Sequence, residues 1–228
     1  MYRYFFKRFF DFIISLVCIC CLSPLLVILA IIGIFAMKGN PFFIQKRPGR
    51  QRKNGVERVF KLIKFRTMSN AKDEDGNLLP DDKRINGYGK FLRSTSLDEL
   101  PELFNIFIGN MAFIGPRPQL VKDLVFMSDE QRKRHKVRPG LSGLAQVNGR
   151  NSITWEEKFA YDLKYIENVT FWSDLILILK TIGKVFKREN TVREGTVSDI
   201  DYGDCLLNAG KITKEEYEEK QNWAKEMY

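Results

Sequence analysis

FIISLVCICCLSPLLVILAIIGIFAM, residues 12–37, is the one stretch of this 228-residue chain with the length and composition of a membrane segment. At about 1.5 Å per residue, a straight helix of this length would reach roughly 39 Å, enough to cross the hydrocarbon core of a bilayer. Ser23 and Pro24 interrupt the apolar run near its middle, and basic residues flank it on both sides. We expect the Ser23 hydroxyl to satisfy a backbone group that Pro24 leaves without a partner.

The flanking charges leave two topologies open for this segment. Positively charged flanks prefer the cytoplasmic side, and a helix that enters, breaks at Ser23-Pro24 and leaves on the same face keeps both flanks there. An ordinary kinked helix that spans the bilayer is about equally compatible with the composition. The sequence therefore predicts a membrane-anchored protein without deciding between these forms.

The chain as a whole is strongly basic. Lys and Arg number 37 against 28 Asp and Glu, a net charge of +9, which implies an anionic partner such as lipid, a nucleotide-linked substrate or nucleic acid. Nucleic acid fits least, because the cations begin beside the apolar segment and no recognised nucleic-acid-binding module is present. The four cysteines make no disulfide framework, so we expect reduced thiols. The single His135 lies among cations and is predicted to be a solvated side chain.

The middle of the chain predicts a mostly helical α/β fold with a small sheet. Residues 41–45 and 59–65 have the composition of short strands, whereas residues 69–87 are polar and turn-rich and indicate a surface loop. Residues 120–134 are expected to form a helix, within which Ser128 is a candidate to begin a further turn.

Three later segments also have helical patterns. Trp155, Phe159, Leu163 and Ile166 recur at near-helical spacing, which indicates a core-facing stripe. Residues 171–186 are apolar but too short to span a bilayer, so they form either an interfacial helix or a buried core helix. A capping-box pattern at Thr213 and Glu216 predicts a charged helix from there to Tyr228.

LRSTSLDELPELFNIFIGNMAFIGPRP, residues 92–118, gathers the residues that carry chemistry. Pro101 is tolerated in the first turn of a helix, so we expect a helix to begin near residues 96–98, with Asp98 and Glu99 at its positive end. Ser96 and Glu99 also form a capping-box pattern, and most such patterns only start helices.

Arginines on stiff loops distinguish this stretch from an ordinary helix start. Arg93 precedes the carboxylate pair, and Pro116 and Pro118 hold Arg117 on a rigid loop after it. Two more arginines lie beside turn residues downstream: Arg138 and Arg150. Because the guanidinium group grips phosphate oxygens two at a time, these arginines suggest a phosphorylated substrate. A carboxylate pair among them suits phosphoryl chemistry, in which one carboxylate attacks and the other holds a divalent cation.

The run SLDELPELFNIFIGNMAFIGPRP, with KFRTM at residues 64–68 and RPGLSGLAQVNGRN at residues 138–151, closely resembles the bacterial sugar transferases. More narrowly, it resembles their small monotopic phosphoglycosyl transferases. Several motifs occur in one order over roughly residues 1–190, which is more specific than any single motif. The resemblance implies a re-entrant membrane helix and a cytosolic catalytic domain with interfacial amphipathic helices. It places the protein on the cytoplasmic face of the bacterial inner membrane.

This resemblance predicts three regions and a reaction. Residues 1–40 would form the re-entrant anchor, residues 41–190 the catalytic domain and residues 191–228 an acidic extension that the resemblance does not cover. The reaction is transfer of a sugar-1-phosphate from a UDP-sugar to polyprenol phosphate, with release of UMP, in the synthesis of a surface glycan. Membrane lipid is the third expected partner, and a homo-oligomer or other glycan-pathway enzymes are possible ones.

The family mechanism assigns roles to individual residues. Asp98 would attack the β-phosphorus and form a phosphosugar-aspartyl intermediate, and Glu99 would ligate Mg²⁺. Pro116 and Pro118 would shape the loop of Arg117. The expected phosphate or nucleotide contacts are Arg93, Arg117, Arg150, Lys64 and Arg138.

Two other functions fit the same sequence. A glycosyltransferase that moves only the sugar would release UDP instead of UMP. A non-catalytic membrane scaffold of a glycan assembly complex would retain its function after Asp98→Asn.

Overall fold

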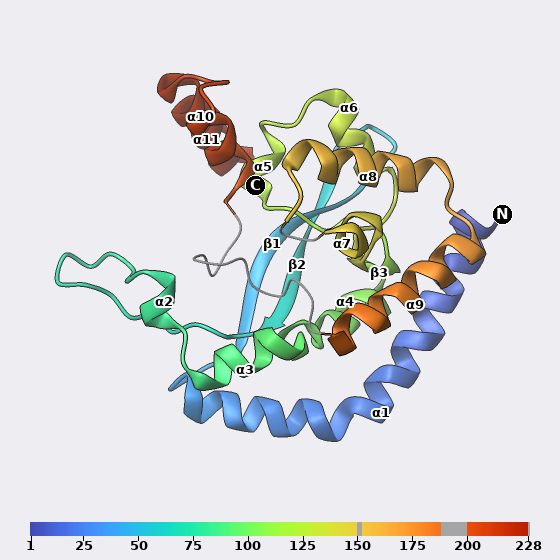
Figure 1. Ribbon diagram of the computed structural model, residues 1–228, viewed down its shortest axis with the longest axis horizontal. Helices are drawn as coiled ribbons and strands as arrows, with labels where there is room; N and C mark the ends of the chain where they lie inside the picture. Colours follow the sequence, from blue (N-terminus) through green and yellow to red (C-terminus); the bar gives the residue numbers. More distant parts are fainter. Residues whose placement is uncertain (150–151, 188–199, 228) are drawn as a thin grey trace.

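Residues 1–149, 152–187 and 200–227 are described by the computed structural model of the chain (Figure 1). Helix α1 (Lys7–Ala36) follows a π-helical turn, Tyr2–Phe6. Figure 1 shows α1 descend from the N-terminus, bend, and run along the base of the molecule. Within the described part of the chain, residues 2–36 form the one helix that is long and apolar enough to cross a membrane.

Pro24 explains the bend in α1. Proline has no N–H to donate to the carbonyl group one turn earlier, that of Cys20, and its ring clashes there. The Ser23 hydroxyl donates to the Cys20 carbonyl oxygen instead, at 2.8 Å, which confirms the role predicted for Ser23. The predicted break is a bend within one continuous helix, and the re-entrant topology stays a prediction.

The segment after α1 forms an antiparallel hairpin and two helices. Strands β1 (Phe42–Gln51) and β2 (Glu57–Phe65) confirm both predicted strands and extend them. The predicted loop that follows contains one helical turn, α2 (Asp81–Arg84). Helices α3 (Gly87–Thr95) and α4 (Glu102–Ile108) come next.

Helix α4 packs against the first half of α1. The Arg8 guanidinium donates to the carbonyl oxygens of Ile106 and Phe107, at 2.7 and 2.6 Å. The rings of Phe12 and Phe107 stack with their centroids 5.0 Å apart. These contacts place the region around α4 directly beside the apolar helix.

A second, smaller sheet and three helices follow along the chain. Strands β3 (Ala112–Ile114) and β4 (Gly140–Ser142) pair in parallel. Helices α7 (Leu144–Asn148), α8 (Trp155–Glu167) and α9 (Phe171–Lys187) follow. The predicted stripe on α8 is confirmed, since Trp155, Phe159 and Ile166 are buried and Leu163 is partly buried. The structure is mostly helical with small sheets, as predicted.

The region between β3 and β4 differs from the prediction. Residues 120–134 do not form one helix but two short ones, α5 (Val121–Leu124) and α6 (Asp129–Arg132), before a 3-10 turn at Lys133–Lys136. Ser128 does begin α6, with a complete capping box to Gln131.

The prediction of a solvated His135 is wrong. Its side chain is buried, with Nδ1 at 3.4 Å from Glu57 Oε1. Arg132 reaches the same carboxylate, with Nη2 at 2.5 Å from Glu57 Oε2. Because Glu57 lies at the start of β2, this ion pair draws the 3-10 turn onto the hairpin and covers the histidine.

Helix α9 is amphipathic and exposed along one face. Trp172 and Leu179 are 69% and 60% exposed, whereas Asp174 and Leu177 are buried on the opposite face. A fully buried core helix, one of the two predictions, is therefore wrong. The exposed apolar face is what an interfacial helix requires.

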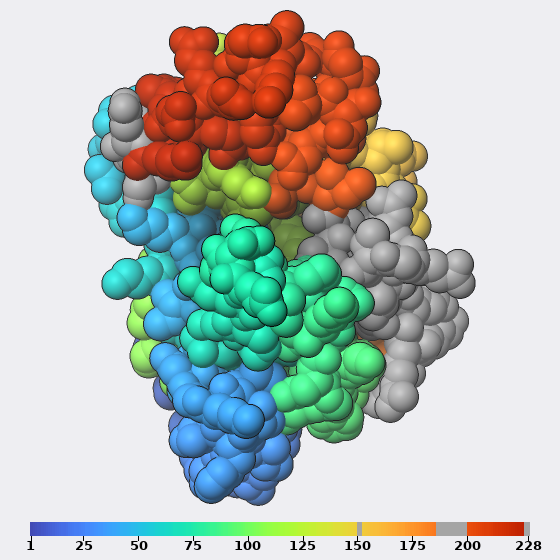
Figure 2. All heavy atoms as spheres, turned by 90° about the vertical axis from the view of Figure 1, so that its left-hand side faces the viewer, coloured from blue at the N-terminus to red at the C-terminus, as the bar shows by residue number. Residues whose placement is uncertain are grey.

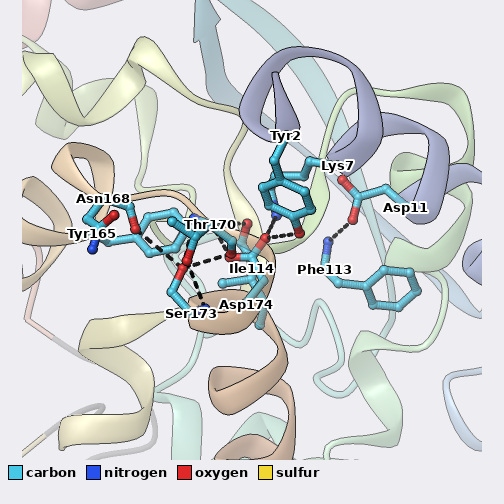
Figure 3. Close-up of polar contacts among 10 residues, drawn as sticks. All are labelled: Tyr2, Lys7, Asp11, Phe113, Ile114, Tyr165, Asn168, Thr170, Ser173 and Asp174. Carbon is cyan, nitrogen blue, oxygen red and sulfur yellow. Dashed lines mark hydrogen bonds and ion pairs between the residues drawn. The ribbon is translucent and has the colours of Figure 1, made fainter.

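The buried face of α9 joins α1 through a polar network (Figure 3). Asp174 Oδ2 accepts hydrogen bonds from Lys7 Nζ at 2.6 Å and from the Tyr2 hydroxyl at 2.8 Å. Asp174 Oδ1 accepts from the Tyr165 hydroxyl, also at 2.8 Å. We call Tyr2, Lys7, Tyr165 and Asp174 the anchor network.

The chain ends in α10 (Tyr202–Asn208) and α11 (Lys214–Met227). The Glu216 N–H donates to Thr213 Oγ1 at 3.2 Å, as the capping pattern predicts. Figures 1 and 2 place these two helices at the end of the molecule opposite the second half of α1.

Candidate active site

Asp98 and Glu99 lie on the short connection between α3 and α4. Ser96 ends α3 in the left-handed backbone conformation, with φ 57°, and a 3-10 turn at Leu97–Glu99 follows. The 3-10 turn confirms the helix start predicted near residues 96–98, although the α-helix α4 itself begins only at Glu102. The suggested capping box is absent: the Ser96 side chain makes no capping hydrogen bond, and the Glu99 carboxylate binds Lys64 and Arg117.

Two cations hold Glu99 in a fixed position. Lys64, at the end of β2, places Nζ 2.8 Å from Glu99 Oε1 and 3.0 Å from Glu102 Oε1. Arg117, on the loop after β3, places Nη2 2.9 Å from the same Glu99 oxygen. Although burial opposes ionisation, Lys64 and Arg117 hold the pKa of Glu99 well below its usual range. Glu99 is therefore a permanently charged carboxylate.

Asp98 has a different environment from its neighbour. It makes no hydrogen bond or ion pair with any described residue. Burial, with repulsion from Glu99, raises the pKa of Asp98 to about 6, although Lys64, Arg93 and Arg117 oppose the rise. At neutral pH the Asp98 carboxylate is thus mostly ionised and free of competing contacts, which suits a nucleophile.

Arg93 is held beside the pair by the KFRTM segment. In the last turn of α3, its Nε donates to Thr67 Oγ1 at 3.0 Å and its Nη2 lies 2.9 Å from Met68 Sδ. Its charge favours the ionised form of Asp98. The structure therefore brings Lys64, Arg93 and Arg117 together around the carboxylates.

Two arginines, the buried Arg134 and the half-buried Arg47, hold the backbone of the Arg117 loop. Pro116 and Pro118 are buried on either side of the exposed Arg117. Arg134 Nη2 donates to the Arg117 carbonyl oxygen at 2.7 Å, and Arg47 Nη1 donates to that of Pro118 at 3.1 Å. The loop thus presents one guanidinium from a firmly held backbone.

Arg138 makes no hydrogen bond or ion pair with Asp98 or Glu99. Its Nε donates to the Gly109 carbonyl oxygen at 2.8 Å, at the end of α4. Burial, with repulsion from Arg8 and Arg50, lowers the pKa of Arg138. Arg150 lies outside the described residues.

Two residues of the site were not foreseen from the sequence. Glu102 is buried, and burial together with Glu99 raises its pKa to about 7. Its spacing of three residues from Glu99 was a signal, because side chains three apart share one side of a helical turn. Burial and the charge of Arg117 lower the pKa of Arg47 to about 10. No local pattern marked Arg47.

The donor set around Glu99 fits a magnesium ion that takes few ligands from protein. Glu99 Oε1 accepts from both Lys64 and Arg117, which leaves Oε2 without a partner among the described residues. Within that part of the chain, no three or more His, Cys, Asp or Glu residues are grouped to hold a metal. Mg²⁺ commonly uses one or two carboxylates and completes its octahedron with substrate phosphates and water.

A carboxylate without a partner among the described residues, beside one that is bound by two cations, is an arrangement that suits phosphoryl chemistry. The chain belongs to the bacterial sugar transferase family, whose profile matches residues 2–188.

Relatives of this chain include characterised transferases. The sugar transferase EpsL of Bacillus subtilis, named as uncharacterised, is 43% identical over 185 residues, 80% of this chain and 88% of the relative. The UDP-glucose:undecaprenyl-phosphate glucose-1-phosphate transferase of Klebsiella pneumoniae is 38% identical over 79% of this chain and 40% of its own length. The undecaprenyl-phosphate galactose phosphotransferase of Salmonella typhimurium is 33% identical over 81% and 41%, respectively. The chain thus spans about two fifths of the latter two proteins.

Proposed function

We propose that the protein transfers a sugar-1-phosphate from a UDP-sugar to polyprenol phosphate in the synthesis of a surface glycan. The names of the Klebsiella and Salmonella relatives support the two substrate classes. The observation that carries the proposal is the difference between Asp98 and Glu99. Asp98 has no partner among the described residues and is only partly stabilised as an anion, whereas Glu99 is fixed by two cations.

The two carboxylates support a two-step mechanism. A carboxylate oxygen of Asp98 attacks the β-phosphorus of the UDP-sugar, and the bond from that phosphorus to the bridging oxygen breaks. UMP leaves with the bonding electron pair, and the sugar phosphate is joined to Asp98. A phosphate oxygen of the polyprenol phosphate then attacks the same phosphorus, and the Asp98 carboxylate departs. The products are polyprenol-diphosphate sugar and UMP.

The cations of the site have separate tasks in this scheme. Arg117 and Arg93 would contact the donor phosphates, since both lie around Asp98 and carry guanidinium groups suited to phosphate oxygens. Lys64 would keep the Glu99 and Glu102 carboxylates in place. Glu99 would hold Mg²⁺, which when bound neutralises charge on the diphosphate.

The apolar elements support a location at the membrane surface. The polyprenol phosphate head lies at the lipid headgroups, so Asp98 must lie at that height. The bent α1 and the exposed face of α9 would bury their apolar residues in the cytoplasmic leaflet and hold the site there. We propose the re-entrant form of α1 on this basis. Cysteine labelling from the two sides of membrane vesicles tests it, because both ends of α1 should be accessible from the cytoplasmic side alone.

Nucleotide release tests the reaction. Detergent-solubilised protein is incubated with Mg²⁺, polyprenol phosphate and a panel of UDP-sugars, and UMP and UDP are measured separately. The proposal predicts UMP that disappears in Asp98→Asn and persists in Asp75→Asn, which removes an exposed loop carboxylate. UDP as the product would instead establish transfer of the sugar alone. Function that survives Asp98→Asn would support a scaffold.

A further inference from the structure

The C-terminal helices α10 and α11 lie beyond the family match, which ends at residue 188. They nevertheless pack on α5, which begins four residues after Arg117. Figure 2 shows them (red) capping the end of the molecule farthest from the second half of α1. We refer to residues 200–227 as the docked extension.

Asp123 of α5 connects the docked extension to the catalytic region. Its side chain is buried, and Oδ1 accepts the backbone N–H groups of Tyr202 and Gly203 at 2.9 and 3.3 Å. The neighbouring Lys122 pairs with Asp201, just before α10. These bonds join α5 to the start of α10, about eighty residues later in the chain. The Asp123 carboxylate accepts the first N–H groups of α10, and hydrogen bonds of this charged kind are stronger than neutral ones.

An aromatic contact closes the same interface. The rings of Phe126 and Tyr217 stack with centroids 5.5 Å apart. Gly203 lies directly against Phe126, and a Cβ atom at position 203 would come within 2.5 Å of Phe126 Cε2. Any larger residue at this position must therefore displace the ring or move α10 away from α5.

The segment that carries Arg117 is thus held at several points. Arg134, which pairs with the buried Asp162 at 2.6 Å, fixes the Arg117 carbonyl, and Arg47 fixes that of Pro118. Beyond these two contacts, the segment continues into α5, whose Asp123 is bound to the docked extension.

We propose that the docked extension is a positioning element for Arg117. By fixing α5, it fixes the end of the loop that presents this guanidinium to Glu99 and to the donor phosphates. This inference rests on the proposed role of Arg117 in donor binding. Asp123 and Gly203 act through Arg117 and touch no substrate, so loosening them affects the KM for the UDP-sugar more than the KM for the lipid.

The experiment uses the full chain with Gly203 replaced by Ala, Val or Leu. Hydrogen exchange at the Tyr202 and Gly203-site amides reports how far α10 has left Asp123, and UMP release gives both KM values. We expect faster exchange with increasing side-chain size, and a KM for the UDP-sugar that rises in parallel by up to about tenfold, because small displacements of a substrate-positioning group are costly. The KM for polyprenol phosphate stays near its original value. Glu219→Ala, at an exposed site of α11, is the matched control.

The outcomes are separable. Faster exchange with an unchanged donor KM would overturn the inference, as would equal rises in both KM values. Full amide protection in all three variants would show that the contact at Gly203 does not hold the extension and would also overturn it. Asp123→Asn, which keeps the side-chain size, serves where a larger residue at 203 prevents folding, and the same relation between exchange and donor KM is expected. If the unaltered protein releases no UMP, the proposed function fails, whereas the inference fails only when UMP release is normal.

Discussion

Two of the charged clusters in the molecule are arranged in opposite ways. In the anchor network, the two Asp174 oxygens accept hydrogen bonds from Lys7, Tyr2 and Tyr165, so every polar group at its centre has a partner (Figure 3). In the catalytic cluster, Lys64 and Arg117 serve Glu99, while the adjacent Asp98 has no partner among the described residues. The closed network suits a structural role, and the open one suits chemistry.

Asp98→Asn should show the difference between the two clusters most clearly, because it should remove activity without reducing stability. UMP release is expected to fall at least about a thousandfold, because the amide is a poor nucleophile. Thermal stability should stay the same or rise slightly, since Asp98 contributes no ion pair and its charge is disfavoured by burial and Glu99. The measurement is UMP release alongside a melting curve in detergent. A large loss of stability would contradict the view that Asp98 is structurally unengaged.

Asp174→Ala should have the opposite profile. Removing one partner of a buried ion pair leaves Lys7 uncompensated, which costs about 3–5 kcal/mol of folding free energy. Chemical denaturation in detergent measures the loss, and UMP release per folded molecule should remain close to normal. The double variant Lys7→Met, Asp174→Leu should recover most of the stability, because no unpaired charge remains. If it is no more stable than Asp174→Ala, the network does more than balance charge.

Arg117→Lys tests whether the open cluster binds phosphate by geometry or by charge. Lysine keeps the positive charge beside Glu99 but loses the planar fork. We expect the KM for the UDP-sugar to rise about 10- to 100-fold, the value of one or two charged hydrogen bonds. Arg58→Lys, at an exposed hairpin site, is the matched control. An unchanged donor KM would show that charge alone suffices at this position.

Local features of the fold could be predicted because their causes are local. Ser23 and Pro24 act within one helical turn, so the sequence alone predicted the bond from the Ser23 hydroxyl. The stripe of Trp155 and Phe159 follows from helical spacing for the same reason. The Asp98–Glu99 pair was likewise found within one motif.

The features that the sequence did not predict depend on contacts between residues that are distant in the sequence. His135 is buried because Arg132 pairs with Glu57, some 75 positions away, and no local pattern records that contact. The capping box suggested by Ser96 and Glu99 is absent, and the Glu99 carboxylate instead binds Lys64 and Arg117, which come from distant segments. Motifs identified the carboxylates, but only the fold showed that one is paired and the other is not.

The pH dependence of the reaction tests this difference between Asp98 and Glu99. Among the described carboxyl groups, the pKa is raised to about 6 for Asp98 and Asp123 and to about 7 for Glu102. Asp98 attacks only when ionised, so kcat/KM for the UDP-sugar should rise with pH through about 6 and level off above it. At pH 5 we expect about a tenfold loss.

Variants can show which carboxyl group causes this rise of kcat/KM with pH, which we call the acid limb. The charge of Arg93 favours the ionised form of Asp98, so Arg93→Gln should raise the Asp98 pKa and move the limb to higher pH, whatever it does to the plateau. Glu102→Gln and Asp123→Asn remove the other two titrating groups and should leave a limb near pH 6. A limb that disappears in either of them, or that does not move in Arg93→Gln, would contradict its assignment to Asp98. A limb that moves as expected would tie the chemistry to Asp98, the member of the pair that has no partner among the described residues.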